Sequence, residues 1–184
     1  MDDLSGSRRG DAAIRLGTQV SCVAYRNPVL LARMAADIDA ISHGRLVLGL
    51  GSGDMPREFQ QMGLAYPTIQ ERQVALEEAI GIIRPLLRGE TVTFAGTHYR
   101  AEGAVLRPLV QQPYIPLLIA GGGERTTLRY VAQYADMSSM AGASWAGGST
   151  RPLMSATSSR ACSAAVRRLA VPTDRSSAQR CSAR

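Results

Sequence analysis

Short apolar runs alternate along this chain with longer stretches in which apolar residues recur every three or four positions. The continuous runs are rich in branched residues and predict buried strands, at about 14–20, 45–50 and 115–120. The periodic stretches predict helices, at about 28–42, 57–62, 69–87 and 124–134. After the third helix, TVTF and THYR flank a turn at Ala95 and Gly96, which indicates a small hairpin. Strands that alternate with helices in this way predict a parallel α/β architecture.

Residues at the helix ends support these boundaries. Asn27 and Pro28 form a typical helix start, with an asparagine cap followed by proline at the first helical position. Thr68 and Glu71 have the spacing of a capping box, in which each side chain satisfies the other residue's backbone N–H. We expect the two long helices to bury one apolar face each, formed by Leu31, Met34, Ala35, Ile38 and Ile41 in the first and by Val74, Ile80, Ile83 and Leu87 in the second.

The pattern divides the chain into two parts at about residue 136. Residues 12–136 carry all of the predicted elements, whereas residues 137–184 hold 11 Ser, 10 Ala and little periodicity. Such a segment buries too little apolar surface to offset its ordering entropy, so we predict an irregular, disordered tail. The net charge of +6 also belongs to the tail, because residues 1–136 hold 14 Arg and 14 acidic residues. The predicted folded part therefore offers no basic surface for nucleic acid.

Composition narrows the setting further. Hydrophobic residues make up 45% of the chain, but no apolar run approaches the length of a membrane span, and the N-terminus is too polar for a secretory signal. The three cysteines are far apart, which disfavours a disulfide framework, and Cys22 is expected to be a small buried residue. His43 and His98 have no partner at metal-ligand spacing. We expect a cytoplasmic protein without metal, nucleic acid or membrane partners.

The main chemical signal is RLVLGLGSGD at 45–54, where a strand ends in glycines on alternate positions, Gly49, Gly51 and Gly53. A dinucleotide-binding turn is disfavoured, because the spacing is G-x-G-x-G and no strand ending in an acid follows. The stretch resembles the first motif of S-adenosylmethionine-dependent methyltransferases, although the acid before the first glycine and the ribose-binding strand are missing. A third interpretation is a barrel strand whose glycines let a flat cofactor ring lie against the backbone.

The third interpretation requires a phosphate-binding turn at the end of another strand. Gly121, Gly122 and Gly123 follow the buried run at 115–120 and precede a helix. The free backbone amides and the positive dipole end of that helix favour an anion, and Arg125 adds positive charge. The sequence therefore predicts a cofactor whose ring lies at one glycine turn and whose anionic arm lies at the other.

Three segments together resemble the bacterial luciferase-like oxidoreductases. They are IRLGTQVSCVAYRNPVLLARMAADIDAISHGRLVLGLGSGD, GETVTFAGTHYR and PLLIAGGGERTTLRYVAQYAD, in the family's order and at its spacing. The resemblance is strongest to the branch that uses coenzyme F420, a deazaflavin, and related members use FMN. It implies a TIM (β/α)8 barrel with an insertion, hydride transfer between F420 or FMN and an organic small molecule, and an oligomer, often a dimer.

The resemblance also implies roles for individual residues. Gln19 and Val20 stand where the family's third strand carries a bulge that supports the ring, and several F420-dependent members have a cis peptide bond there. Ser52, Gly53 and Asp54 stand where the fourth strand meets the ring. Some members hold a proton-donating carboxylate at the place of Asp54, although this residue also suits the cap of a helix that starts near Pro56. Gly121, Gly122 and Gly123 match the phosphate site.

The resemblance covers only part of a barrel. A complete barrel needs about 250 residues and eight strand–helix units, whereas residues 12–136 supply about strands 3 to 5 with the insertion. We therefore expect a partial barrel followed by an irregular tail. Three functions remain open at this point: an F420- or FMN-dependent oxidoreductase, a truncated remnant without catalytic activity, or an S-adenosylmethionine-dependent methyltransferase.

Overall fold

Five strands of the computed structural model form a parallel sheet whose order follows the chain. The structure describes residues 14–107, 110–121 and 126–139. The strands of this sheet are β1 (Leu16–Gly17), β2 (Ser21–Cys22), β3 (Leu46–Gly51), β6 (Leu117–Ala120) and β7 (Met137–Ser139). Both β1 and β2 pair with β3, then β3 pairs with β6 and β6 with β7, always in parallel. The described residues thus supply four adjacent strand positions of a curved parallel wall, and the predicted α/β class is confirmed.

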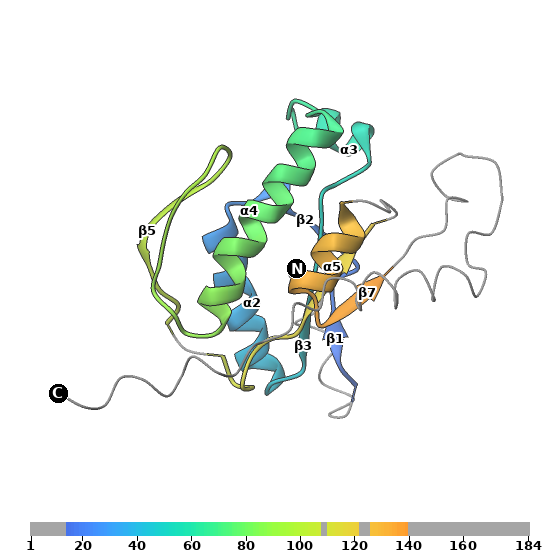
Figure 1. The fold of residues 1–184 in the computed structure, drawn as a ribbon. Coiled ribbons are helices and arrows are strands. Elements are labelled where there is room, and N and C mark those ends of the chain that lie inside the picture. The colour runs from blue at the N-terminus through green and yellow to red at the C-terminus, as the bar shows by residue number, and fades with distance from the viewer. Residues whose placement is uncertain (1–13, 108–109, 122–125, 140–184) are drawn as a thin grey trace, which may run out of the picture.

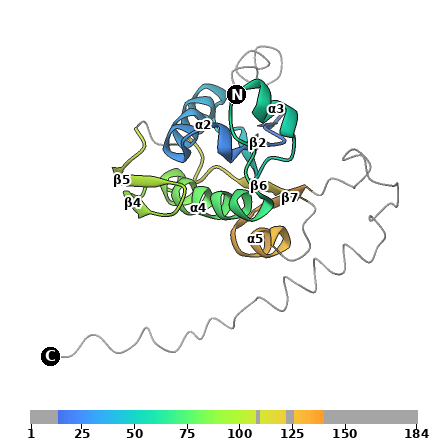
Figure 2. The same ribbon diagram turned by 90° about the horizontal axis from the view of Figure 1, so that it is seen from above.

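Helices cover one face of this sheet. The described helices are the short 3-10 helix η1 (Val23–Tyr25) and the α-helices α2 (Pro28–Ser42), α3 (Pro56–Gln61), α4 (Ile69–Leu87) and α5 (Thr127–Tyr134). Figures 1 and 2 show α2, α4 and α5 placed around the sheet, whereas α3 lies beyond the end of β3. Alternate residues of β3 and β6 point into the core under the helices: Leu46, Leu48, Leu50, Leu117 and Ile119. The opposite face of the sheet carries the glycines.

The predicted helix starts are confirmed in detail. The Asn27 side chain accepts a hydrogen bond of 2.9 Å from the backbone N–H of Val29, and Pro28 is the first residue of α2. Thr68 and Glu71 form the capping box at the start of α4, with Glu71 accepting the Thr68 N–H at 2.8 Å. Helix α2 ends at Ser42, and its C-cap residue His43 has a left-handed φ of 55°. These local signals fixed the ends of the two longest helices.

The predicted helix faces are partly wrong. Ile41 is 44% exposed and Val74 is 41% exposed, although both were expected in the core, and Met34 is only half-buried. The helices are instead rotated so that small residues are buried on both of these packed helices, namely Ala32, Ala35 and Ala36 of α2 and Ala75 and Ala79 of α4. Small side chains allow the two helix backbones to approach closely. This rotation also buries Asp39 and Arg72, which an apolar periodicity does not reveal.

The sheet continues past the predicted boundary at residue 136. Strand β7 begins at Met137, and its sequence, Met-Ser-Ser, has no apolar run that marks it as a strand. Its position is fixed by pairing with β6 and by Asp136, which accepts a hydrogen bond of 2.9 Å from the N–H of Leu117. The remaining part of the predicted tail, residues 140–184, lies outside the described residues. No helix in the described ranges is long and apolar enough to cross a membrane.

The predicted hairpin is present as β4 (Val92–Ala95) and β5 (Arg100–Ala104), an antiparallel pair that packs beside α4 (Figure 1). Glu78 of α4 holds its turn, because the carboxylate accepts the backbone N–H groups of Thr97, His98 and Tyr99 at 2.7, 2.8 and 3.0 Å. Gly96 lies against this carboxylate, where a Cβ would collide with it. These three hydrogen bonds to Glu78, which we call the hairpin clamp, connect the hairpin to α4.

We expect the hairpin clamp to depend on pH. Desolvation raises the pKa of Glu78, but the hydrogen bonds from His98, Thr97 and Tyr99 outweigh it, so the net pKa lies below its ordinary value. A lowered pKa stabilises the clamp above the pKa of the unfolded chain, about 4.3, and this contribution is lost as the pH falls through the folded value. Hydrogen exchange of the 96–99 amides should therefore accelerate, relative to α2, between about pH 6 and pH 3.

The Glu78→Gln variant is the matched test of this clamp. It keeps the shape of the side chain but removes the charge, so exchange at 96–99 should be fast at both pH values and the pH dependence should disappear. Hydrogen bonds to a charged group contribute about 1.5–3 kcal/mol each, so the loss is measurable. Equal pH dependence of the hairpin in both proteins would show that another group controls it.

Candidate active site at the strand ends

The site is formed where the parallel strands end at one edge of the sheet. In the register of β3 and β6, Leu50 pairs with Ile119, so Gly51 lies beside Ala120 and Gly121 follows one residue further along the chain. Beyond β6, the N–H of Gly121 donates a hydrogen bond of 3.2 Å to the carbonyl of Ser139 at the end of β7. The predicted adjacency of the two glycine-bearing strand ends is therefore confirmed. Gly122 and Gly123 lie outside the described residues.

The edge strand carries the expected bulge. Leu16 pairs with Leu46 in β1, but Ser21 pairs with Leu50 in β2, so this strand contains one more residue than β3 over the same span. The extra residue lies in the segment that includes Gln19 and Val20, and the peptide bond between them is cis. Both features were implied by the family resemblance.

The glycines of β3 make room for this bulge. A Cβ on Gly49 would collide with the backbone carbonyl oxygen of Thr18, and a Cβ on Gly51 would lie 2.5 Å from Cγ2 of Val20. Gly53 has a φ of +78°, and a Cβ there would lie 2.6 Å from Sγ of Cys22. The interpretation that a cofactor ring lies directly on Gly49 and Gly51 is therefore corrected, because Thr18 and Val20 of the neighbouring segment fill the space. Thr18 and Val20, on either side of Gln19 in the bulge, therefore cover the face of β3 that carries Gly49 and Gly51.

A hydrogen bond connects the two outer strands of the described sheet. The Gln19 amide donates to Oγ of Ser139 at 2.6 Å, although β3 and β6 separate their strands in the sheet order. Ser139 therefore belongs to the site, whereas the sequence pattern assigned it to an irregular tail. Because no apolar run precedes Ser139, the sequence pattern does not predict a strand there, and its place in the site becomes apparent only from the pairing of β7 with β6.

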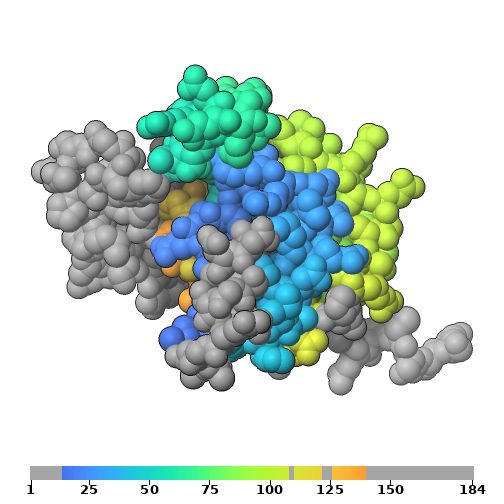
Figure 3. Space-filling view, turned by 180° about the vertical axis from the view of Figure 1, so that it is seen from behind, coloured from blue at the N-terminus to red at the C-terminus, as the bar shows by residue number. Residues whose placement is uncertain are grey.

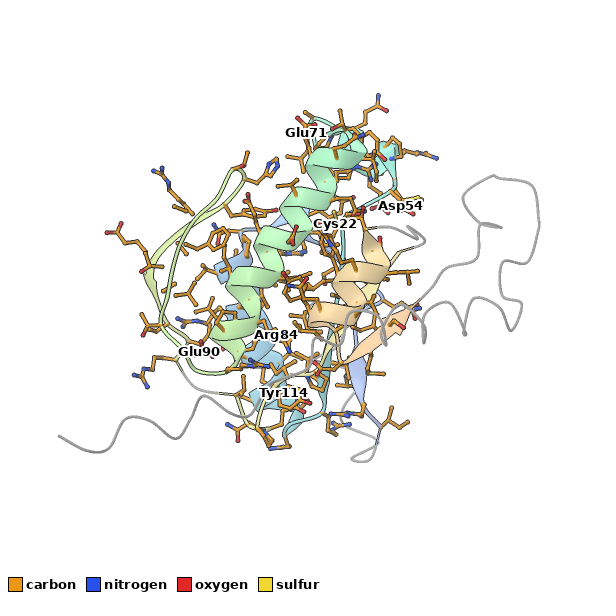
Figure 4. All side chains as sticks on the ribbon, in the orientation of Figure 1. Cys22, Asp54, Glu71, Arg84, Glu90 and Tyr114 are labelled. Atoms are coloured by element: carbon orange, nitrogen blue, oxygen red, sulfur yellow. The ribbon has the colours of Figure 1, made fainter. Side chains whose placement is uncertain are left out.

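The segment after β3 presents Ser52, Gly53 and Asp54 beside the first turns of α4. The hydroxyl of Ser52 accepts a hydrogen bond of 3.4 Å from the amide of Gln73. Asp54 is exposed, and among the described residues neither its carboxylate nor its N–H has a hydrogen-bond partner. The alternative that Asp54 caps a helix is wrong, because the N-cap of α3 is Met55 and makes no side-chain cap bond. Figure 4 shows Asp54 and Cys22 at the same end of the molecule, opposite Arg84 and Tyr114.

Sequence reasoning did not identify Arg72. Its side chain is only 7% exposed, its Nη1 donates to the carbonyl of Gly53, and its Nε donates to the carbonyl of Pro67 at 3.2 Å. The guanidinium lies 4.5 Å from the ring centroid of Tyr66. Figure 3 shows α3 and the loop after it at one end of the molecule. Because Arg72 contacts Tyr66 and Pro67 of this loop as well as Gly53, it connects the loop to the segment that follows β3.

Gly121 links β6 to α5. It has a φ of +151°, and a Cβ would lie 3.0 Å from Cγ2 of the buried Thr127, so both the backbone and the space require glycine. Helix α5 starts at Thr127, and the N-cap residue Thr126 makes no side-chain cap bond. Tyr130 anchors α5 on α4, because its hydroxyl donates to Oε2 of Glu77 at 2.9 Å. The N-terminus of α5 therefore lies beside the ends of β6 and β7.

Other candidate residues are structural. His43 is the left-handed cap of α2, and His98 lies in the hairpin turn held by Glu78. Burial raises the pKa of the half-buried Cys22 thiol, which disfavours a nucleophilic thiolate at neutral pH. Within the described ranges, no three His, Cys, Asp or Glu side chains gather where they could hold a metal ion.

The topology also argues against the methyltransferase alternative. After β3 the chain forms α3, α4 and the hairpin before β6 pairs in parallel with β3 on the side away from β1 and β2. No strand that ends in a ribose-binding acid lies beside the glycine turn in the part of the chain that the structure describes. Strands that keep the chain order around a curved wall are typical of a (β/α)8 barrel.

Comparisons with known proteins agree with this architecture. The chain is 35% identical over 123 residues to an F420-dependent glucose-6-phosphate dehydrogenase from Amycolatopsis mediterranei (strain U-32), covering 66% of this chain and 35% of the relative. The coenzyme F420-dependent tetrahydromethanopterin reductase of Methanopyrus kandleri superposes with a TM-score of 0.61 at 26% identity, covering 69% of this chain and 40% of the reductase. An F420-dependent secondary alcohol dehydrogenase in complex with an F420-acetone adduct shares the fold, with a TM-score of 0.66 at 22% identity, over 84% and 44% of the two chains.

These matches identify the fold as part of a TIM barrel, as the sequence predicted, and leave no support for a methyltransferase. The chain spans about a third of the length of the curated relatives it matches. The family model described as luciferase-like monooxygenase matches residues 11–162. This chain therefore belongs to the luciferase-like monooxygenase family.

Proposed function

We propose that this chain contributes the cofactor-binding wall of an oxidoreductase that binds the deazaflavin F420, with FMN as the alternative. In this proposal hydride passes between the cofactor ring and an organic small molecule. The observation that carries it is the meeting of the Gln19–Val20 bulge, the Ser52–Asp54 segment and Gly121 at one edge of the sheet. The curated relatives named F420-dependent dehydrogenases support the choice of F420.

The described residues fit such a cofactor. The bulge at Gln19 and Val20 lies over the glycines of β3 and offers backbone to a flat ring. Gly121 packs its bare backbone against Thr127 at the start of α5, and a helix N-terminus favours the anionic arm of a nucleotide-like cofactor. Asp54 adds an N–H and a carboxylate without partners in the described part of the chain.

The cofactor supplies the hydride chemistry, and the protein supplies binding, orientation and protons. In our proposal, Gln19 and Val20 support the ring, while Gly121, Gly122 and Gly123 hold its anionic arm. Ser52 and Gly53 border the ring, and the Asp54 carboxylate holds or transfers a proton close to it. The homodimer implied by the family stays a prediction.

The proposal predicts saturable cofactor binding by the purified chain. Titration with F420 and with FMN should change the cofactor fluorescence to saturation and raise the melting temperature, because a ligand at 100 times its Kd stabilises by about 2.7 kcal/mol. Gly121→Ala should weaken binding about tenfold or more, because the added Cβ meets Thr127 beside the anionic arm.

Gly103→Ala is the matched control. Gly103 also has a positive φ, +55°, but nothing lies within 4 Å of an added Cβ, and it belongs to the hairpin. Both variants therefore strain the backbone, and only Gly121→Ala should weaken cofactor binding. If the chain melts without cooperativity and binds neither cofactor, the remnant without catalytic activity is the better description.

A further inference from the structure

Arg72 is a buried cation whose charge is compensated by carbonyl groups and an aromatic ring. Within the described ranges no carboxylate lies at ion-pair distance from it, since the ion pair found there joins Arg129 and Glu77. Its donors instead reach the carbonyls of Gly53 and Pro67, and the Tyr66 ring covers its guanidinium. Burying a charge is costly unless its hydrogen bonds are satisfied, so this arrangement requires the carbonyl of Gly53 to stay where it is.

The position of that carbonyl also sets the direction of the next N–H. Gly53 and Asp54 are joined by a trans peptide, since the cis bond of the described chain lies between Gln19 and Val20. In a trans peptide the C=O and the N–H point in opposite directions. Because the Gly53 carbonyl points toward Arg72 on α4, the Asp54 N–H points away from that helix, and it has no partner among the described residues.

A second contact from the same turn of α4 supports this role. Gln73, the residue after Arg72, donates to Ser52, the residue before Gly53. The Oε1 atom of Gln73 is buried and has no hydrogen-bond partner within the described structure. Two adjacent residues of α4 therefore hold Ser52 and Gly53, two adjacent residues of the segment after β3. Asp54 is the first residue of that segment that has no hydrogen bond within the described structure.

We propose that Arg72 is a positioning residue, which fixes the Gly53 carbonyl and thereby presents the N–H and carboxylate of Asp54 to a bound cofactor or substrate. This inference rests on the proposed function for the identity of the ligand. Lysine cannot replace arginine here, because its single ammonium cannot donate in two fixed directions while stacking flat on Tyr66. The effect of Arg72 is therefore exerted through Gly53, and Arg72 itself is no catalytic residue.

The test compares Arg72→Lys with Arg84→Lys on the same helix. Arg84 lies toward the opposite end of α4, away from Asp54 (Figure 4), and its hydrogen bond within the described part of the chain is a weak one, of 3.5 Å, to the carbonyl of Gln133. The first measurement needs no cofactor: hydrogen exchange of a peptide covering residues 51–59, relative to a peptide in α2. The second is the Kd for F420 and for FMN, measured by fluorescence titration of the full chain.

We expect faster exchange at 51–59 in Arg72→Lys, unchanged exchange in α2, and cofactor binding weakened about tenfold or more. Arg84→Lys should match the parent chain in both measurements. The proposal is overturned if exchange at 51–59 stays at the parent rate, or if it rises equally in α2. It is also overturned if exchange rises locally while the Kd stays unchanged.

The same experiment separates this inference from the proposed function. If the parent chain binds neither F420 nor FMN, the proposed function fails. The local rise of exchange at 51–59 in Arg72→Lys would then still support the positioning of Asp54 by Arg72, and the ligand would have to be sought elsewhere.

Discussion

The Gly49→Ala variant is expected to lose the native sheet, with a destabilisation of more than about 4 kcal/mol. The added Cβ would collide with the backbone carbonyl oxygen of Thr18, and it would also lie 3.0 Å from the carbonyl carbon of Thr18 and 3.1 Å from Cγ1 of Val20. The Thr18 backbone cannot withdraw easily, because the Thr18 hydroxyl is hydrogen-bonded to both the carbonyl and the N–H of Gly49, at 3.1 and 3.2 Å. Thermal melting and urea denaturation of the purified chains measure the loss.

Gly81→Ala is the matched control for this prediction. Gly81 lies inside α4, and an added Cβ would meet only Cε2 of Phe94, at the ordinary contact distance of 3.4 Å. Alanine is favoured over glycine in a helix interior by about 0.5–1 kcal/mol, so this variant should be neutral or more stable. If the Gly49→Ala chain melts within a few degrees of the parent, the bulge does not require a glycine at residue 49.

Gly49 also shows what the sequence could and could not predict. The alternate glycines indicated a close approach to the end of β3, and the structure contains that approach. However, the approaching group is the bulge at Thr18 and Val20 rather than a ligand. A glycine pattern records that space is needed, but it does not record which group fills the space, because that group belongs to a strand about 30 residues away in the sequence.

Local signals predicted the parts of the fold that depend on neighbours in sequence. The Asn27 cap and the Thr68–Glu71 capping box are bonds between residues two and three positions apart, and both are present. The site residues that were missed act over longer distances. Arg72 reaches Gly53 across 19 positions, and Gln19 reaches Ser139 across 120. A polar residue whose partner is far away in the sequence gives no periodic signal.

The two ends of the sheet are held by different buried polar residues. At the carboxyl end, Arg72 holds the segment that we propose to meet the cofactor. At the other end, Asp39 of α2 holds the loop before β6, which contains Gln111 and Gln112. Because β6 starts directly after this loop, its pairing with β3 depends on the loop being fixed. A defect at Asp39 should therefore reach the whole sheet, whereas a defect at Arg72 should stay local.

The Asp39→Ala variant is expected to be destabilised by about 3–5 kcal/mol, because a buried network loses its acceptor. Asp39 is completely buried, and its carboxylate accepts the N–H of Gln111 at 2.8 Å and the amide of Gln112 at 2.7 Å. The Gln112 amide also donates to the carbonyl of Leu46 at 2.9 Å, so it joins the loop to the start of β3. Removing the carboxylate leaves the Gln111 N–H and the Gln112 amide without this buried acceptor.

Asp37→Ala provides the control, since Asp37 lies two residues away on α2 and is exposed. An exposed substitution of this kind changes stability by less than about 0.5 kcal/mol. Asp39→Asn should fall between the two, because the amide keeps one acceptor oxygen but turns an NH₂ group toward a donor. Denaturation midpoints that rank Asp39→Ala below Asp39→Asn and both below Asp37→Ala would establish that the acceptor at residue 39 holds the amino end of the sheet. Equal midpoints for Asp39→Ala and Asp37→Ala would show instead that the loop before β6 is held by its apolar contacts alone.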